Sequence, residues 1–171
     1  MIETDQCPWS PEHNGGLRVS NLQTGVLSCP LGSTAGQHHF TPELRVRKAQ
    51  KEQRLYTLLY GIVEARVATI ADPACIVALW MIGFEDQPER SAEICIFEIF
   101  GNEMASDKAT AGMGLHPFGD SGIQNDFVKI PVKMDATESD TYSVQCIPGR
   151  VQFFIDDEAV ASMDQSPDYP I

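Results

Sequence analysis

The chain has 171 residues, and its 12 Lys and Arg against 24 Asp and Glu give a formal net charge of −12 at neutral pH. This acidic balance argues against nucleic acid or an anionic membrane as a partner, because binding to phosphate groups relies on Lys and Arg. The hydrophobic fraction of 43% and charged fraction of 21% are those of a folded globular protein and exclude a disordered or collagen-like chain. We expect one domain over residues 1–171.

The sequence shows no targeting signal or membrane span. Met1 to Asp5 is acidic where a secretory signal needs basic residues, and the apolar run at 74–84 is shorter than the roughly 18–20 residues that cross a bilayer. The cysteines are scattered and form no C-x-x-C pair: Cys7, Cys29, Cys75, Cys95 and Cys146. We therefore expect a cytoplasmic protein with reduced thiols, no cofactor and no bound metal.

The apolar residues repeat with a period closer to two than to 3.6, which predicts strands. Residues 61–70 alternate apolar and charged side chains, and 75–82 form a continuous apolar run that suits a strand buried on both faces. Residues 93–100 and 151–155 are further strands, the latter running into a turn at 156–157. Short strands at this spacing predict an all-β sandwich.

One segment, 41–58, is open to two interpretations. Thr41-Pro42 is a fair helix start, and Leu44, Leu55 and Leu58 fit one face of a helix. Leu44 and Val46 also alternate with charged residues, and we favour a strand followed by an exposed loop. Five basic residues of this stretch then lie in a solvated loop rather than in a binding patch.

Two carboxylates, Glu93 and Glu98, bracket an apolar strand from which ionised side chains are normally excluded. Positions five apart in a regular strand point to opposite faces, so the two share a face only if a residue bulges near Ile96 or Phe97. The alternative is that Glu93 closes the preceding loop while Glu98 points to solvent on the other face.

Several stretches resemble glycoside hydrolase family 16, whose members are concanavalin A-like jelly rolls that cleave β-glucans and related polysaccharides. Residues 60–66 resemble its Y-G-x-x-E-A-R strand, 78–83 resemble A-x-W-x-x-G, and 93–98 match both ends of E-x-D-x-x-E. A histidine at 116 and a hairpin at 141–156 follow in the family's order. The resemblance runs from about Trp9 to Ile171, and it implies an all-β, concanavalin A-like β-sandwich.

The resemblance also implies an activity and a set of site residues. Glu93 would be the nucleophile and Glu98 the general acid/base of a retaining glycosidase that cleaves internal β-glycosidic bonds of a β-glucan-like polysaccharide. Cys95 would lie between them in the catalytic motif. Trp80, His116 and Phe118 would contact the substrate, and neither a cofactor nor a metal is implied.

The sequence departs from the family pattern at positions that bear on catalysis. Cys95 replaces an Asp, and a thiol with a reference pKa near 8.5 is mostly neutral. Cys146 stands where the family usually has Trp, Asp140 where it usually has His, and Ile76 where many members carry a Trp. The alternative function is therefore a non-catalytic or degenerate carbohydrate-binding sandwich.

Two further interpretations stay open. One interpretation brings Cys95, His116 and Cys146 together as a metal site or a Cys/His pair, whereas the commoner role of such cysteines is that of buried structural thiols. We interpret the pair His38-His39 as loop residues. The chain ends near Ile171, where the resembled family continues into further strands. This predicts a domain lacking its last strands, or a shortened product without a function of its own.

Overall fold

The computed structural model describes residues 20–34 and 45–171, and within these ranges the chain is built of strands and one short 3₁₀ turn, η1 (Gly101–Glu103). The strands in chain order are β1 (Gly25–Val26), β2 (Gln53–Arg54), β3 (Gly61–Val67), β4 (Ile76–Ile82), β5 (Glu93–Phe100), β6 (Ala109–His116), β7 (Asp126–Val132), β8 (Asp140–Ile147), β9 (Arg150–Ile155) and β10 (Glu158–Met163). The predicted all-β class is confirmed.

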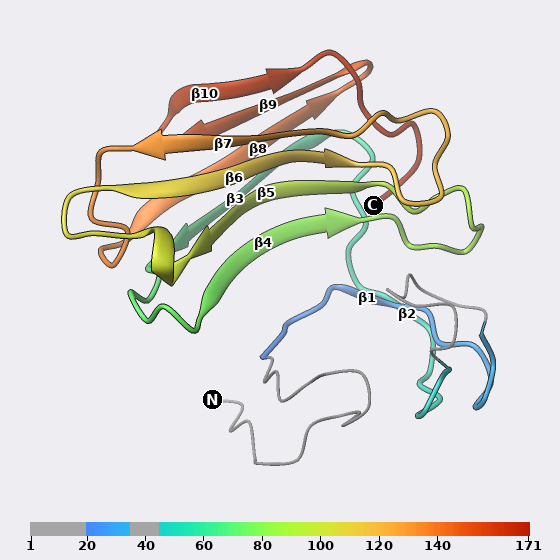
Figure 1. Cartoon of the computed structure of the whole chain (residues 1–171). Helices are drawn as coiled ribbons and strands as arrows, with labels where there is room; N and C mark the ends of the chain where they lie inside the picture. The colour runs from blue at the N-terminus through green and yellow to red at the C-terminus, as the bar shows by residue number, and fades with distance from the viewer. Residues whose placement is uncertain (1–19, 35–44) are drawn as a thin grey trace.

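Two four-stranded antiparallel sheets form the sandwich, with the orders β10-β9-β8-β3 and β4-β5-β6-β7. Figure 1 shows the two sheets stacked as layers, with the short β1-β2 ribbon beside them. The alternation of residues along each strand sends one set of side chains between the sheets and the other set outward.

The core lies between the two sheets and is made by the central strands. Its fully buried large side chains come from β5, β6, β8 and β9: Ile94, Ile96, Phe97, Ile99, Met113, Leu115, Tyr142, Val144, Val151 and Phe153. Phe97 of one sheet stacks on Tyr142 of the other, with ring centroids 4.1 Å apart. This contact fixes β5 against β8 at the level of the two candidate carboxylates.

The strand expectations hold with two adjustments. The strand predicted at 61–70 ends at Val67, and that predicted at 75–82 begins at Ile76. The expectation that the latter is buried on both faces is wrong, because Ile76 and Trp80 are each 50% exposed. The physical reason is that β4 is the edge strand of its sheet and its outward face carries no covering layer.

Residues 45–58 form loops around the short strand β2, with no helix. The exposed-loop interpretation is therefore confirmed from residue 45 on, whereas Thr41, Pro42 and Leu44 lie outside the described residues. No strand forms around Val46. His38, His39 and Trp9 also lie outside the described part of the chain.

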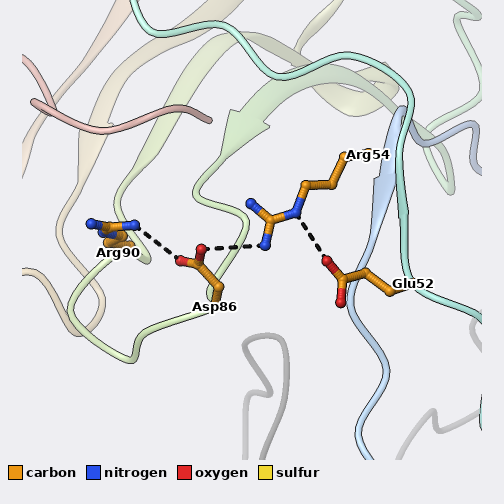
Figure 2. Close-up of polar contacts among 4 residues, drawn as sticks. All are labelled: Glu52, Arg54, Asp86 and Arg90. Atoms are coloured by element: carbon orange, nitrogen blue, oxygen red, sulfur yellow. Dashed lines mark hydrogen bonds and ion pairs between the residues drawn. The ribbon is translucent and has the colours of Figure 1, made fainter.

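Arg54, the last residue of β2, makes ordered contacts with its neighbours. Its guanidinium lies 3.9 Å from the centre of the Phe84 ring and pairs with Glu52 at 3.0 Å and Asp86 at 3.3 Å. Asp86 also pairs with Arg90 at 3.5 Å, as Figure 2 shows. The network joins β2 to the loop that leads into β5, although each exposed pair adds little stability on its own.

Candidate active site

A β-bulge lies within β5, between the two glutamates. On the β4 side, Leu79 pairs with Phe97 and Trp80 with Cys95, so two steps along β5 oppose one step along β4. On the β6 side, Cys95 pairs with Gly114 and Glu98 with Gly112, so three steps oppose two. Both registers place one extra residue in β5 at Ile96 or Phe97, and the predicted bulge is confirmed.

The bulge places Glu93 and Glu98 on one face of the sheet. Glu98, Cys95 and Glu93 pair with Ala78, Trp80 and Ile82 of β4, which are two residues apart and therefore point the same way. The alternative in which the glutamates point to opposite faces is wrong. Ile96 and Phe97 are instead both buried in the core.

We call this outward surface the carboxylate face and define it by Glu93, Cys95, Glu98 and their neighbours in the same cross-strand rows. These neighbours are Ala78, Trp80 and Ile82 on β4, Gly112, Gly114 and His116 on β6, and Phe127 and Lys129 on β7. The glycines leave room there. A Cβ on Gly112 would lie 2.8 Å from Cγ of Glu98 and 2.6 Å from the tip of the Phe127 ring.

Burial is the main electrostatic influence on Glu93, which is half-buried at the start of β5. Burial raises the pKa of its carboxyl above the ordinary value, His116 lowers it and Glu98 raises it further. The net direction favours the protonated form. A general acid needs that direction, whereas a nucleophile needs the opposite one.

Cys95 lies between the two carboxylates and is 1% exposed. Burial raises the pKa of its thiol far above the ordinary value, and Glu93 and Glu98 add to the effect. The thiol is therefore neutral at physiological pH, as its chemistry predicts. It brings a weak hydrogen-bond donor and no charge to the site.

His116 ends β6 opposite Glu93 and has two ordered contacts. Its Nδ1 lies 2.7 Å from the Asn125 side-chain oxygen, and its ring stacks on Phe127 with centroids 4.9 Å apart. Phe118 follows in the next turn, 6.0 Å from His116, with a φ of 44° that side chains rarely adopt. The predicted substrate-contact residues Trp80, His116 and Phe118 thus lie on or beside the carboxylate face.

A pocket of about 430 Å³ lies along the β4 edge of the sandwich, and Glu93, Cys95, Glu98 and His116 are not among the residues that line it. Trp80 and Ile82 line it from β4, and Leu22, Tyr56 and Phe84 line it from the segments that pack beside the strand. Its lining is largely apolar with aromatic rings, which suits the apolar C–H faces of a sugar.

The Cys95, His116 and Cys146 grouping does not form. Cys146 lies on β8 in the other sheet, is 2% exposed and directs its sulfur to the Leu59 carbonyl at 3.8 Å. Within residues 20–34 and 45–171 no group of His, Cys, Asp and Glu is arranged to hold a metal ion. Nor is any helix there long and apolar enough to cross a membrane.

Sequence reasoning missed Asn125, Phe127 and Lys129. Phe127 and Lys129 reach the carboxylate face only because β7 pairs with β6 in one register, Gly114 with Phe127 and Gly112 with Lys129. No local motif marks that register. The glycines at alternate positions of β6 were the available signal, because they indicate that a neighbouring side chain covers that face.

No protein-family model matches the chain, and no curated protein does. Among solved structures, a GlcNAcα1-4Gal-releasing endo-β-galactosidase from Clostridium perfringens is 25% identical, with a TM-score of 0.78, over 97% of this chain and 41% of its own. A non-specific endo-β-1,3(4)-glucanase of glycoside hydrolase family 16 is 21% identical, with a TM-score of 0.53, over 65% of this chain and 41% of its own.

A family 16 endo-glucanase from Bacteroides ovatus matches with 18% identity and a TM-score of 0.50 over 64% of this chain and 49% of its own. The chain resembles glycoside hydrolase family 16. The two glucanases show the shared sandwich fold alone, at their low identity. The chain spans about two fifths of the length of the endo-β-galactosidase.

Proposed function

We propose that this chain carries the catalytic strand of a retaining endo-glycosidase that cleaves internal β-glycosidic bonds of a polysaccharide. Glu93 acts as the nucleophile and Glu98 as the general acid/base. The main support is the bulge in β5, which brings both glutamates to the carboxylate face although they are five residues apart. The likeness to endo-acting glycoside hydrolases adds independent support.

The reaction needs two carboxyl groups in different protonation states. In the first step Glu93 attacks the anomeric carbon while Glu98 gives a proton to the departing oxygen, and a glycosyl ester forms on Glu93. In the second step Glu98 removes a proton from water, which attacks the ester and restores both groups. Retention requires carboxyl groups about 5–5.5 Å apart.

The comparisons guide the choice of the substrates to test. The endo-β-galactosidase aligns with nearly the whole chain at 25% identity, whereas the glucanases align with about two thirds of it. A glycan with internal β-galactosidic bonds is therefore the first substrate to test, and a β-1,3- or mixed-linkage glucan is the second. Trp80, His116 and Phe118 are the side chains that we propose contact the sugars.

The test compares Glu98→Ala on two substrate types. General-acid help, worth about 10²–10⁴-fold, matters only when the departing oxygen needs a proton. Turnover of the natural glycan should therefore fall far more than turnover of an aryl glycoside with an activated leaving group. Glu93→Gln should abolish both, and equal loss on both substrates in Glu98→Ala would overturn the acid role.

A second candidate is carbohydrate binding without cleavage, and Cys95 is the residue that favours it. A neutral buried thiol leaves Glu93 without the acidic neighbour that the resembled motif provides. If the chain is a weakened enzyme, Cys95→Asp should raise turnover while Cys95→Ser leaves it nearly unchanged. A folded Cys95→Asp variant that binds the glycan but does not cleave it would favour the binding function.

A further inference from the structure

Asn125 precedes β7 and holds the histidine that pairs with Glu93 across the strands. The distance from its side-chain oxygen to Nδ1 of His116 is 2.7 Å, well within hydrogen-bond range. With the amide oxygen facing Nδ1, the contact is a hydrogen bond when Nδ1 carries the proton and donates it, because an amide oxygen only accepts. The other ring nitrogen, Nε2, is then the basic atom of the imidazole.

The orientation of the His116 ring is fixed as well, by a stacking contact with Phe127. Phe127 stacks on His116 with an interplanar angle of 24° and a centroid distance of 4.9 Å. Phe127 comes two residues after Asn125 and is fixed by its pairing with Gly114. One contact therefore sets the tautomer of His116, and the other limits rotation of its ring.

Glu93 depends on His116 because the rest of its surroundings favour the neutral carboxyl. Burial and Glu98 both oppose ionisation, and His116 is the group that favours it. Cys95 is neutral, Lys129 of β7 pairs with Glu103 at 2.7 Å, and the β4 residues of the carboxylate face carry no titratable group.

We propose that Asn125 is a positioning residue that fixes the Nδ1–H tautomer of His116, so that Nε2 is the ring nitrogen left to interact with Glu93 across the strands and favour its ionised carboxylate. The role assigned to Glu93 rests on the proposed function, whereas the link from Asn125 through His116 to Glu93 is a property of the folded chain. The same arrangement of an oriented imidazole beside a reacting group operates in catalytic triads.

The first measurement is ¹⁵N NMR of the imidazole nitrogens, with the His116 signals assigned by their loss in His116→Gln. The wild type should show protonated Nδ1, and Asn125→Ala should move the population toward Nε2–H. Asn125→Asp keeps an acceptor oxygen and should retain the wild-type tautomer. Gln124→Ala is the matched control, because Gln124 bonds Gln165 through its backbone.

The second measurement follows the consequence at Glu93. Asn125→Ala should lower kcat about tenfold with little change in KM, and should move the acidic limb of the pH profile to higher pH, since Glu93 loses the influence that favours its ionised form. Asn125→Asp should restore kcat to within about threefold of wild type. An unchanged tautomer in Asn125→Ala, or a changed tautomer with unchanged kcat and pH profile, would overturn the proposal.

If the wild-type chain is inactive, the proposed function is wrong, but the link from Asn125 through His116 to Glu93 can still be tested. In that case ¹³C NMR titration of the Glu93 carboxyl replaces the kinetics. The carboxyl should titrate at higher pH in Asn125→Ala than in wild type or Gln124→Ala. Equal titration midpoints in the three proteins would overturn the proposal.

Discussion

Glu93 combines a chemical role with an unfavourable position. The half-buried carboxyl has a raised pKa in the folded chain, so folding favours its protonated form. The stabilisation that this gives is fully present below the ordinary pKa of 4.5 and is lost as the pH rises through the raised value. At neutral pH the ionised carboxylate therefore lowers the stability of the fold, as is common for functional groups.

Replacing Glu93 with glutamine, its neutral isostere, tests directly whether the ionised carboxylate lowers the stability of the fold. Glu93→Gln should raise Tm at pH 7, where the carboxylate that it replaces is ionised, and should change Tm much less near pH 4. Thermal unfolding followed by circular dichroism at both pH values measures the difference. Glu89→Gln, at an exposed loop position, is the control, and a lower Tm for Glu93→Gln at pH 7 would contradict the assignment.

At the scale of elements, the side chains of β5 on the carboxylate face depend on space that the neighbouring strand β6 leaves for them. The rows across the sheet place Gly112 beside Glu98 and Gly114 beside Cys95. Because neither glycine has a side chain, Glu98 can lie over β6 and Phe127 can reach across from β7.

Adding one methyl group should disturb the site more than the fold. In Gly112→Ala the new Cβ meets side-chain atoms of Glu98 and Phe127, which must shift. We expect kcat to fall by at least tenfold with a loss of less than about 2 kcal/mol in unfolding free energy. Gly114→Ala is the contrast, because its φ is +147° and its Cβ would meet the Asp126 backbone at 2.1 Å, and it should fail to fold. A fully active Gly112→Ala would show that Glu98 does not need this space.

Two buried tyrosines of the sandwich make a matched pair. The hydroxyl of Tyr142 is buried with no hydrogen-bond partner among the described residues, whereas that of Tyr169 donates to Asp120 at 2.7 Å and accepts from the Ala92 backbone at 2.9 Å. A buried polar group without a partner is destabilising, and a paired one is not.

Removing the two hydroxyls should therefore change the free energy of unfolding in opposite directions. Tyr142→Phe should raise the free energy of unfolding by about 1 kcal/mol and keep the stack on Phe97, while Tyr169→Phe should lower it by about 1–2 kcal/mol. Urea unfolding of the two variants measures both values. A clear loss of stability in Tyr142→Phe would mean that its hydroxyl has a partner.

The sequence predicts individual strands better than it predicts which strands pair, in what register, and what covers their faces. Alternation in β3 was enough to predict a strand, because it depends on the local period. The spacing of the two glutamates in β5 left two alternatives open, and the resemblance to family 16 was what favoured the bulge. The run in β4 was misjudged, since an all-apolar strand looks the same whether a sheet or a binding surface covers its second face. Asn125 and Phe127 join the site through strand register, which no short motif encodes.

At the scale of the whole molecule, the edge strands of the two sheets within the described residues are β3, β4, β7 and β10, and each pairs with one neighbouring strand. Two of these strands expose an apolar side chain, with Ile62 of β3 61% and Ile76 of β4 50% exposed, and β3 also exposes Glu64 and Arg66 on the same face. Exposed apolar edges promote pairing with other chains. This chain should therefore associate as its concentration rises, against the repulsion of its −12 net charge.

Lysine at the two edges should reduce that association. The double variant Ile62→Lys/Ile76→Lys should sediment as a monomer at concentrations where the wild type forms larger species, because edge charges oppose strand pairing. Leu31→Lys controls for added charge, since Leu31 is exposed and lies outside the strands. A wild type that is monomeric throughout the concentration series would show that these edge strands do not promote association between chains.

The most direct test of the central claim is to trap the covalent intermediate. A 2-deoxy-2-fluoro β-glycoside with an activated leaving group slows the second step, and the labelled peptide can then be identified by mass spectrometry after pepsin digestion. The two-carboxylate mechanism predicts one sugar adduct per chain, located on Glu93 and absent in Glu93→Gln. An adduct on Glu98, or hydrolysis of natural glycan by a chain that forms no adduct on Glu93, would contradict it.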